Sequence, residues 1–199
     1  MNYLLLLLLP IFLFSIEIIQ KPIMFSDKRV QLTKDYIKKR YNLDVSDIKI
    51  VPKIIVVHHT GFNSFELSYS RFYEELLPRV RVDISKASPL NVSSHYMIDR
   101  DGKIYSLMPD NHMARHTIGL NYSSIAIENV GAQNHEDNLT NKQLLANAKL
   151  IRYLKNKYKS IKHVIGHYEY REYEDTPYWL ETDSNYRTVK HDPSRRFMR

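Results

Sequence analysis

Five short apolar runs along the chain have the length and the residue types of β-strands. They are rich in valine, isoleucine and tyrosine, which favour strands, and turn residues separate them. The sequence Asp99–Gly102 predicts a tight hairpin between two of them, because Asp-Gly tolerates the positive φ that such turns need. The strands are expected at Ile54–His58, His95–Asp99, Ile104–Met108, Ser124–Asn129 and His163–Gly166.

Apolar residues at helical spacing mark three other stretches. Ser26 can cap a helix that runs to about Tyr41, and a second helix is expected over Phe65–Leu77. A third begins after Thr140. The residues predicted on its inner side are Leu144, Leu145, Ala148, Leu150, Ile151 and Leu154. Strands mixed with helices, and one hairpin, predict an α/β fold: a single domain with a central mixed β-sheet flanked by α-helices.

The N-terminal sequence MNYLLLLLLPIFLFSIEIIQK contains an apolar stretch from Leu4 to Phe14. This stretch has the length of the hydrophobic region of a signal peptide and is short for a membrane span. Ser15 is a weak cleavage site, so an uncleaved anchor over Tyr3–Ile19 stays an alternative. Both interpretations predict an exported protein, in the periplasm or elsewhere in the cell envelope.

Composition narrows the chemistry. The chain has 199 residues, 43% hydrophobic and 26% charged, which suits one globular domain. It has no cysteine, so a metal site must use histidine, aspartate, glutamate or water. The net charge of +7 favours an anionic partner, such as nucleic acid, lipid headgroups or a cell-wall polymer. Lysines and arginines are scattered and no RNA-binding signature is present, which disfavours nucleic acid.

Histidines gather at the ends of the predicted strands. A single histidine in such a place is more often a hydrogen-bonded structural residue than a ligand. Several of them in a chain without cysteine favour zinc. The histidines in question are His58, His59, His95, His116 and His167.

Two acidic residues could complete such a site. Glu128 closes the apolar strand SIAIE, where a buried carboxylate without a partner would cost several kcal/mol, so it is expected in a cleft or in a functional role. Asp192 lies in KHDP, directly before a proline. Taken alone, KHDP is also typical of an ordinary surface turn.

Five sequence blocks are informative when taken together and in their order along the chain: KIIVVHHTG, NVSSHYMIDRDGKIYSLMP, ARHTIGLNYSSIAIENVG, VIGHYE and KHDP. Together, over about Ile37 to Pro193, they resemble the zinc-dependent N-acetylmuramoyl-L-alanine amidases of the type 2 family, which includes animal peptidoglycan recognition proteins. Ser94 stands where the recognition proteins and phage enzymes have a tyrosine, so the resemblance is to the bacterial, glutamate-containing branch. The resemblance implies the α/β fold of this family.

The resemblance also implies the site. His58, His167 and Asp192 would hold one zinc ion per chain, Glu128 would act as acid/base and Lys190 would stabilise the oxyanion. The residues expected to contact substrate or orient these groups are His59, His95, His116 and Asn121, with His116 also a second oxyanion donor.

The choice between the two adjacent histidines rests on the resemblance. Side chains alternate along a strand, so His58 and His59 point to opposite faces and only one can face the cleft. Strand geometry leaves both open, and the resemblance selects His58.

The implied function is hydrolysis of the amide bond between N-acetylmuramic acid and the L-alanine of the stem peptide, in cell-wall turnover or remodelling. The alternative is a non-catalytic peptidoglycan-binding module on the same fold. A histidine-rich nuclease or a structural envelope protein would leave the five blocks unexplained. We expect peptidoglycan or muropeptides as partner, no nucleic acid, membrane attachment through the N-terminal segment if it stays uncleaved, and a monomer. The expected division is 1–20 signal peptide or membrane anchor, 21–52 helical extension and 53–199 zinc amidase domain.

Overall fold

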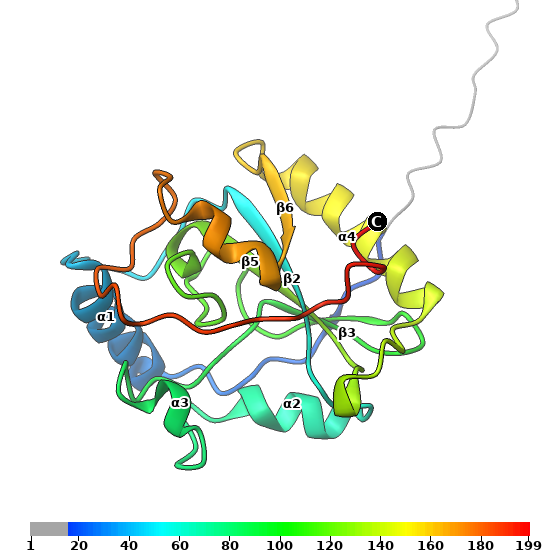
Figure 1. Ribbon diagram of the computed structural model, residues 1–199, viewed down its shortest axis with the longest axis horizontal. Helices are drawn as coiled ribbons and strands as arrows, with labels where there is room; N and C mark the ends of the chain where they lie inside the picture. Colours follow the sequence, from blue (N-terminus) through cyan, green and yellow to red (C-terminus); the bar gives the residue numbers. More distant parts are fainter. Residues whose placement is uncertain (1–15) are drawn as a thin grey trace, which may run out of the picture.

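The computed structural model describes residues 16–199 of the chain (Figure 1). The apolar stretch Leu4–Phe14, and with it the signal-peptide prediction, lies outside the described residues. Among residues 16–199, no helix combines the length and the apolar character needed to cross a membrane.

A six-stranded mixed sheet forms the centre of the molecule, in the order β1-β4-β3-β5-β2-β6. β3 and β4 are antiparallel and the other neighbours are parallel, as a mixed sheet requires. At the predicted hairpin the Asp99 N–H donates to the Lys103 carbonyl, and Gly102 has the positive φ of 88° expected there. The strands are β1 (Ile19–Gln20), β2 (Ile54–His59), β3 (Tyr96–Ile98), β4 (Ile104–Ser106), β5 (Ser124–Asn129) and β6 (His163–Gly166). The predicted sheet is confirmed, with β1 as an additional edge strand.

The helices begin where the capping residues predict. The Ser26 hydroxyl accepts from the Lys28 N–H, and Thr140 forms a capping box with Gln143. The second helix stops at Tyr73, earlier than predicted, because the following residues pair with the segment around Leu90. The helices are α1 (Asp27–Tyr41), α2 (Phe65–Tyr73), α3 (Val82–Ser85) and α4 (Asn141–Lys157), with 3-10 turns η1 (Asn121–Ser123), η2 (Gln133–His135) and η3 (His167–Tyr173).

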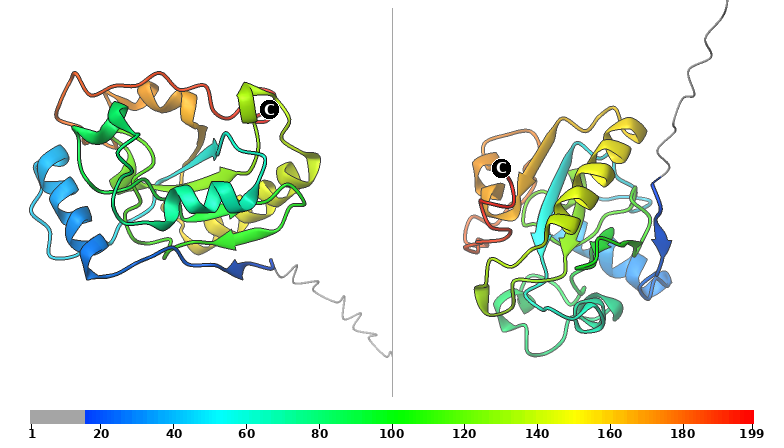
Figure 2. Two further views of the ribbon diagram at one scale, coloured as in Figure 1. Left: turned by 90° about the horizontal axis from the view of Figure 1, so that it is seen from below. Right: turned by 90° about the vertical axis from the view of Figure 1, so that its right-hand side faces the viewer.

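The two faces of the sheet have different cores. Ile55 and Val57 of β2 pack with Leu150 of α4, which lies along one face (Figure 2). Ile54 and Val56 belong to the core of the opposite face, which the segments around η1 and η3 cover. The alternation along β2 therefore assigns odd-numbered positions to the α4 face and even-numbered positions to the other.

The inner side of α4 differs from the prediction. Leu144 and Leu145 are 44% and 63% exposed, and Ala148 is exposed too, whereas Gln143 and Asn147 are buried. The Gln143 side-chain amide donates to the Ile98 and Val130 carbonyls, and Asn147 donates to the Asn129 side chain. These amides face the sheet because they satisfy polar groups there, which an apolar pattern does not reveal. The two leucines are left on the outer side.

Candidate metal centre and active site

Three side chains far apart in sequence meet at the end of β2. His58 ends the even-numbered face of β2, away from α4, and His167 opens η3 directly after the neighbouring β6. The Tyr168 N–H donates to the Asp192 carbonyl at 3.0 Å, which holds Asp192 beside His167. His58 Nδ1 lies 3.0 Å from His167 Nδ1 and 3.2 Å from Asp192 Oδ2, and His167 Nδ1 lies 3.0 Å from Asp192 Oδ2.

This donor set fits a zinc ion. Oxygen and nitrogen ligands lie about 2.0–2.2 Å from a tetrahedral zinc, which sets them about 3.3 Å apart. In the described part of the chain, His58, His167 and Asp192 form the single cluster of such donors, all within 4.8 Å. Burial, followed by the nearby His167, lowers the pKa of His58 to about 4, so its ring is neutral at pH 7, the form that binds metal. The choice of His58 over His59 agrees with the face that each occupies.

A chain of hydrogen bonds sets the tautomer of His58. The Ser124 hydroxyl donates to the Leu120 carbonyl, so its oxygen accepts from His116 Nε2–H, 3.1 Å away. Burial lowers the pKa of His116 well below its usual value, so the ring is neutral and its Nδ1 carries a lone pair. His58 Nε2, 3.0 Å from that Nδ1, is therefore the donor. The lone pair of His58 is left on Nδ1, the atom that faces His167 and Asp192.

The same contacts correct the expected role of His116. Both of its ring nitrogens have partners inside the protein, so neither is free to donate to an oxyanion. No local pattern points to Ser124, because a serine at the start of a strand is common.

Glu128 lies opposite His58 in the β2–β5 register. Its side chain is buried, and its Oε2 atom has no hydrogen-bond partner among the described residues. Burial, with the negative charge of Asp192, raises the pKa of Glu128 well above its usual value, and the positive charge of Lys190 opposes this shift. A buried carboxyl group with a free oxygen beside a metal-binding cluster can hold and transfer a proton.

His58, His167 and Glu128 line a cleft of about 430 Å³. Lys190 lines the same cleft, and so does His59, whose pKa is lowered by burial. The expectation that only one of the two adjacent histidines can reach the cleft is therefore wrong. Arg71 and Arg81, which sequence reasoning did not single out, also line the cleft. Its cationic lining suits a ligand that carries carboxylates.

Asn121 supports this site through hydrogen bonds to the backbone beside His116 and to α1. Its side-chain oxygen accepts from the N–H groups of His116 and Thr117 at 2.8 and 2.7 Å. Its amide donates to the Tyr36 and Tyr41 hydroxyls of α1. Asn121 thus orients the segment that carries His116, and it links α1 to the site.

His95 does not line the cleft. Its Nε2 atom lies 2.8 Å from the His112 carbonyl, and its Nδ1 accepts from the Ala126 N–H at 2.9 Å. Burial lowers the pKa of His95 to about 4. Of the two roles expected of His95, a substrate contact does not fit, because both ring nitrogens bond to the backbone of the fold, and the role of orienting neighbouring groups stays a prediction.

The acidic and aromatic segment before Lys190, residues 171–188, is called the strap here, and its C-terminal part forms one wall of the cleft. Leu180 donates its N–H to the Gly119 carbonyl at 2.9 Å. Gly119 has a φ of 78°, and the space beside it is filled by the Trp179 ring, so a larger residue there would displace the ring. The strap is therefore an ordered part of the domain.

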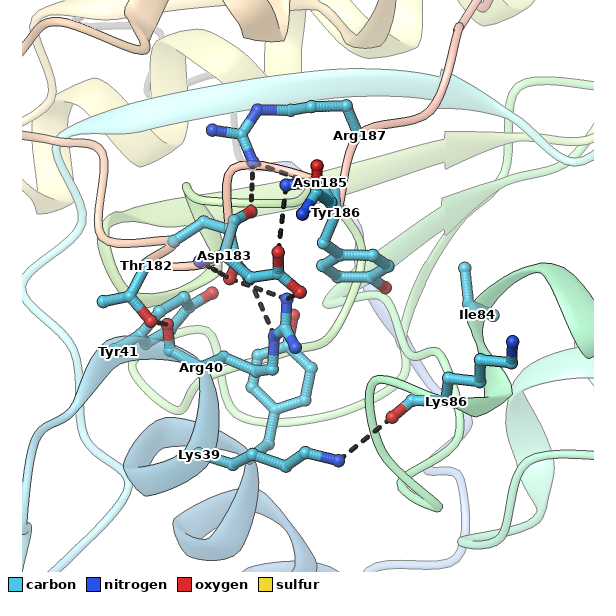
Figure 3. Close-up of polar contacts among 12 residues, drawn as sticks. Lys39, Arg40, Tyr41, Ile84, Lys86, Thr182, Asp183, Asn185, Tyr186 and Arg187 are labelled. Atoms are coloured by element: carbon cyan, nitrogen blue, oxygen red, sulfur yellow. Dashed lines mark hydrogen bonds and ion pairs between the residues drawn. The ribbon is translucent and has the colours of Figure 1, made fainter.

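The strap also contacts α1 (Figure 3). The Arg40 guanidinium donates to the Glu181 carboxylate at 3.0 and 2.7 Å, both side chains being buried, and also to Asp183. The same guanidinium stacks 4.4 Å from the Tyr186 ring centroid. Tyr186 and Thr188 then line the cleft. Sequence reasoning missed this wall because its partners in α1 lie about 140 residues away.

Comparisons with known proteins identify the family and the fold. A family model described as N-acetylmuramoyl-L-alanine amidase matches residues 48–194. A selenomethionine derivative of AmpD is 22% identical, with a TM-score of 0.51 over 82% of this chain and 89% of AmpD, which shows a common fold.

Two further solved structures are similar at lower TM-scores. The amidase LysC from Clostridium intestinale URNW is 24% identical, with 80% and 88% of the two chains covered and a TM-score of 0.48. PGRP-SA from Apis mellifera is 23% identical, with 84% and 100% covered and a TM-score of 0.48. No curated protein matches the chain by sequence.

Proposed function

The chain belongs to the family of N-acetylmuramoyl-L-alanine amidases, which are peptidoglycan hydrolases. We propose that it cuts the amide bond between N-acetylmuramic acid and the L-alanine of the stem peptide with one zinc ion and Glu128 as acid/base. The observation that carries this proposal is the convergence of two histidine Nδ1 atoms and the Asp192 carboxylate, with both histidines and the unpaired Glu128 Oε2 at one cleft.

The residues have separate roles. His58, His167 and Asp192 hold the zinc ion, which when bound supplies Lewis acidity and makes water a stronger acid. Glu128 accepts the proton of the attacking water and delivers it to the amide nitrogen, which leaves poorly until protonated. Lys190 donates a hydrogen bond to the oxyanion that develops on the carbonyl oxygen.

The surroundings suit this substrate. Stem peptides carry carboxylates, and the cleft presents Arg71, Arg81 and Lys190. The net charge of +7 would attract the chain to an anionic wall in a salt-dependent way. The apolar stretch Leu4–Phe14 supports export to the cell envelope, either as a cleaved signal peptide or as a membrane anchor.

Digestion of purified peptidoglycan tests the reaction. The zinc-loaded chain is expected to release free stem peptides, identified by mass, and chelation of the metal should stop the release. Stems that remain on shortened glycans would refute the proposal. If the chain pellets with peptidoglycan but releases no peptide from any preparation, the alternative of a non-catalytic binding module replaces it.

A further inference from the structure

The outer face of α4 is basic and partly apolar. The 17 residues of α4 include no aspartate or glutamate. Lys142, Lys149, Arg152 and Lys155 are exposed there, and in the described part of the chain none of these four forms an ion pair. The outward Leu144 and Leu145 lie among these cations. A helix with this composition is typical of one that rests on a membrane surface.

The chain enters the described fold next to this face. Ile16 borders two shallow grooves. The other side of one groove is formed by Leu145 and Lys149 of α4, and that of the second by Tyr153 and Lys157. β1 pairs with β4 from residue 19 onward, which fixes the start of the described chain to the sheet beside α4.

The apolar stretch Leu4–Phe14 ends two residues before Ile16. Two residues span about 7 Å even when fully extended, at about 3.4 Å per residue. A bilayer that receives the apolar stretch therefore comes within reach of the grooves and of the lysines beside them. Only Ser15 separates the apolar stretch from Ile16 in the sequence.

We propose that the outer face of α4, with the grooves beside Ile16, is a docking surface for anionic phospholipid headgroups. The lysines and Arg152 contact the headgroups, and Leu144 and Leu145 enter the boundary between headgroups and acyl chains. A wall polymer offers the same charge but no apolar layer for the leucines, which favours the lipid. His58 and Glu128 point to the face of the sheet opposite α4, so the docked domain presents its cleft away from the membrane.

A single dye label tests this surface. Because the chain has no cysteine, Leu145→Cys gives one attachment point for an environment-sensitive fluorophore. The full chain is mixed with vesicles of phosphatidylglycerol and phosphatidylcholine, or of phosphatidylcholine alone. We expect a shift of the emission to shorter wavelength, larger with phosphatidylglycerol. The matched control is Val80→Cys, which is 74% exposed and next to the cleft residue Arg81, and its label should not shift.

Charge reversal separates the possible occupants. Lys142→Glu with Lys149→Glu should remove the shift at Leu145→Cys, while the exposed α1 pair Lys28→Glu with Lys38→Glu should leave it unchanged. Equal shifts at both labels, or no shift at Leu145→Cys in a chain that floats with the vesicles, would overturn the proposal. So would an α4 charge reversal that abolishes pelleting with lipid-free peptidoglycan but leaves the dye signal unaltered, since the occupant would then be the wall.

Discussion

Two buried carboxylates, Asp110 and Glu128, differ in their hydrogen-bond partners and in the direction of their pKa shifts. Both are 7% exposed. Asp110 accepts hydrogen bonds from the Tyr96 and Tyr158 hydroxyls at 2.9 and 2.6 Å and from the Lys157 ammonium at 2.9 Å. Glu128 keeps an oxygen without a partner in the described residues. Burial raises the pKa of Glu128, whereas at Asp110 the three donors outweigh burial and lower the pKa.

The difference shows what burial of a carboxylate means in each place. Around Asp110 the fold supplies enough donors to offset desolvation, so the group stabilises the structure. Around Glu128 the fold supplies no hydrogen-bond donor to Oε2, so the cost of desolvating the carboxylate is not offset. The cleft tolerates this cost because the group can exchange a proton there.

The largest expected effect is on catalysis. Glu128→Gln keeps the shape of the side chain but removes the acid/base, so release of stem peptides should fall about 10² to 10⁴-fold. The free energy of unfolding should stay equal or rise, because a poorly solvated charge is removed. Product mass analysis and urea unfolding measure the two effects. The exposed Glu66→Gln on α2 should change neither, and release near the wild-type rate in Glu128→Gln would end the assigned role.

Asp110 should give the reverse pattern. Asp110→Ala leaves the buried Tyr96 hydroxyl without an acceptor, and we expect the free energy of unfolding to fall by about 3 kcal/mol. Turnover per folded molecule should be unchanged. Urea unfolding and peptide release at low temperature check both points. Tyr153→Phe, next to Lys157 but without a bond to Asp110, is the control; a loss of turnover without a loss of stability would erase the contrast.

His116 is expected to act by orienting His58 through a hydrogen bond. His116→Phe removes the acceptor for His58 Nε2–H, so zinc affinity should fall about 10 to 100-fold, the usual effect of removing a support of a metal ligand. Competition with a chelator measures the affinity directly, without reference to turnover. His112→Phe, a half-buried histidine outside the cleft, should leave it unchanged. Unaltered affinity in His116→Phe would show that the hydrogen-bond chain does not fix the ligand.

The smallest effect concerns pH. The pKa of Asp110 is lower in the folded than in the unfolded chain, so its stabilisation is complete above the unfolded value of about 4 and is lost as the pH falls through the folded value. The gap in unfolding free energy between wild type and Asp110→Ala should therefore narrow below about pH 4. Urea unfolding at pH 7 and pH 3.5 tests this. A gap that is equal at both values would contradict the assigned contacts.

Sequence reasoning succeeded where a single physical signal decides the structure. β5 and β6 lie at the predicted residues, because buried strands need an unbroken apolar run. It failed at the inner side of α4, where Gln143 and Asn147 are buried for their hydrogen bonds and Leu145 is not. The face of His58 could be assigned only when the core on each side of β2 was known.

The candidate site was partly predictable for a related reason. The identities of His58, Glu128, His167 and Asp192 came from the family resemblance, and local pattern alone left KHDP as a surface turn. Ser124, which orients His116, and the wall formed by the strap depend on contacts between distant segments, and no local pattern specifies these. The predicted division at residue 52 stays a prediction, although α1 contributes Tyr36 to the cleft.

The pairing of β2 has a consequence for the time course of folding. Ile54 pairs with Ser124 on one side and with His163 on the other, so β2 cannot complete its pairing until partners far along the chain are in place. Pairings of such long sequence separation are slow to form, because the entropy of closing large loops must be overcome first. The cleft groups sit on these same strands and on the segment of Asp192. Activity should therefore emerge in one late, cooperative step during refolding, with no partly folded species that already hydrolyses the wall.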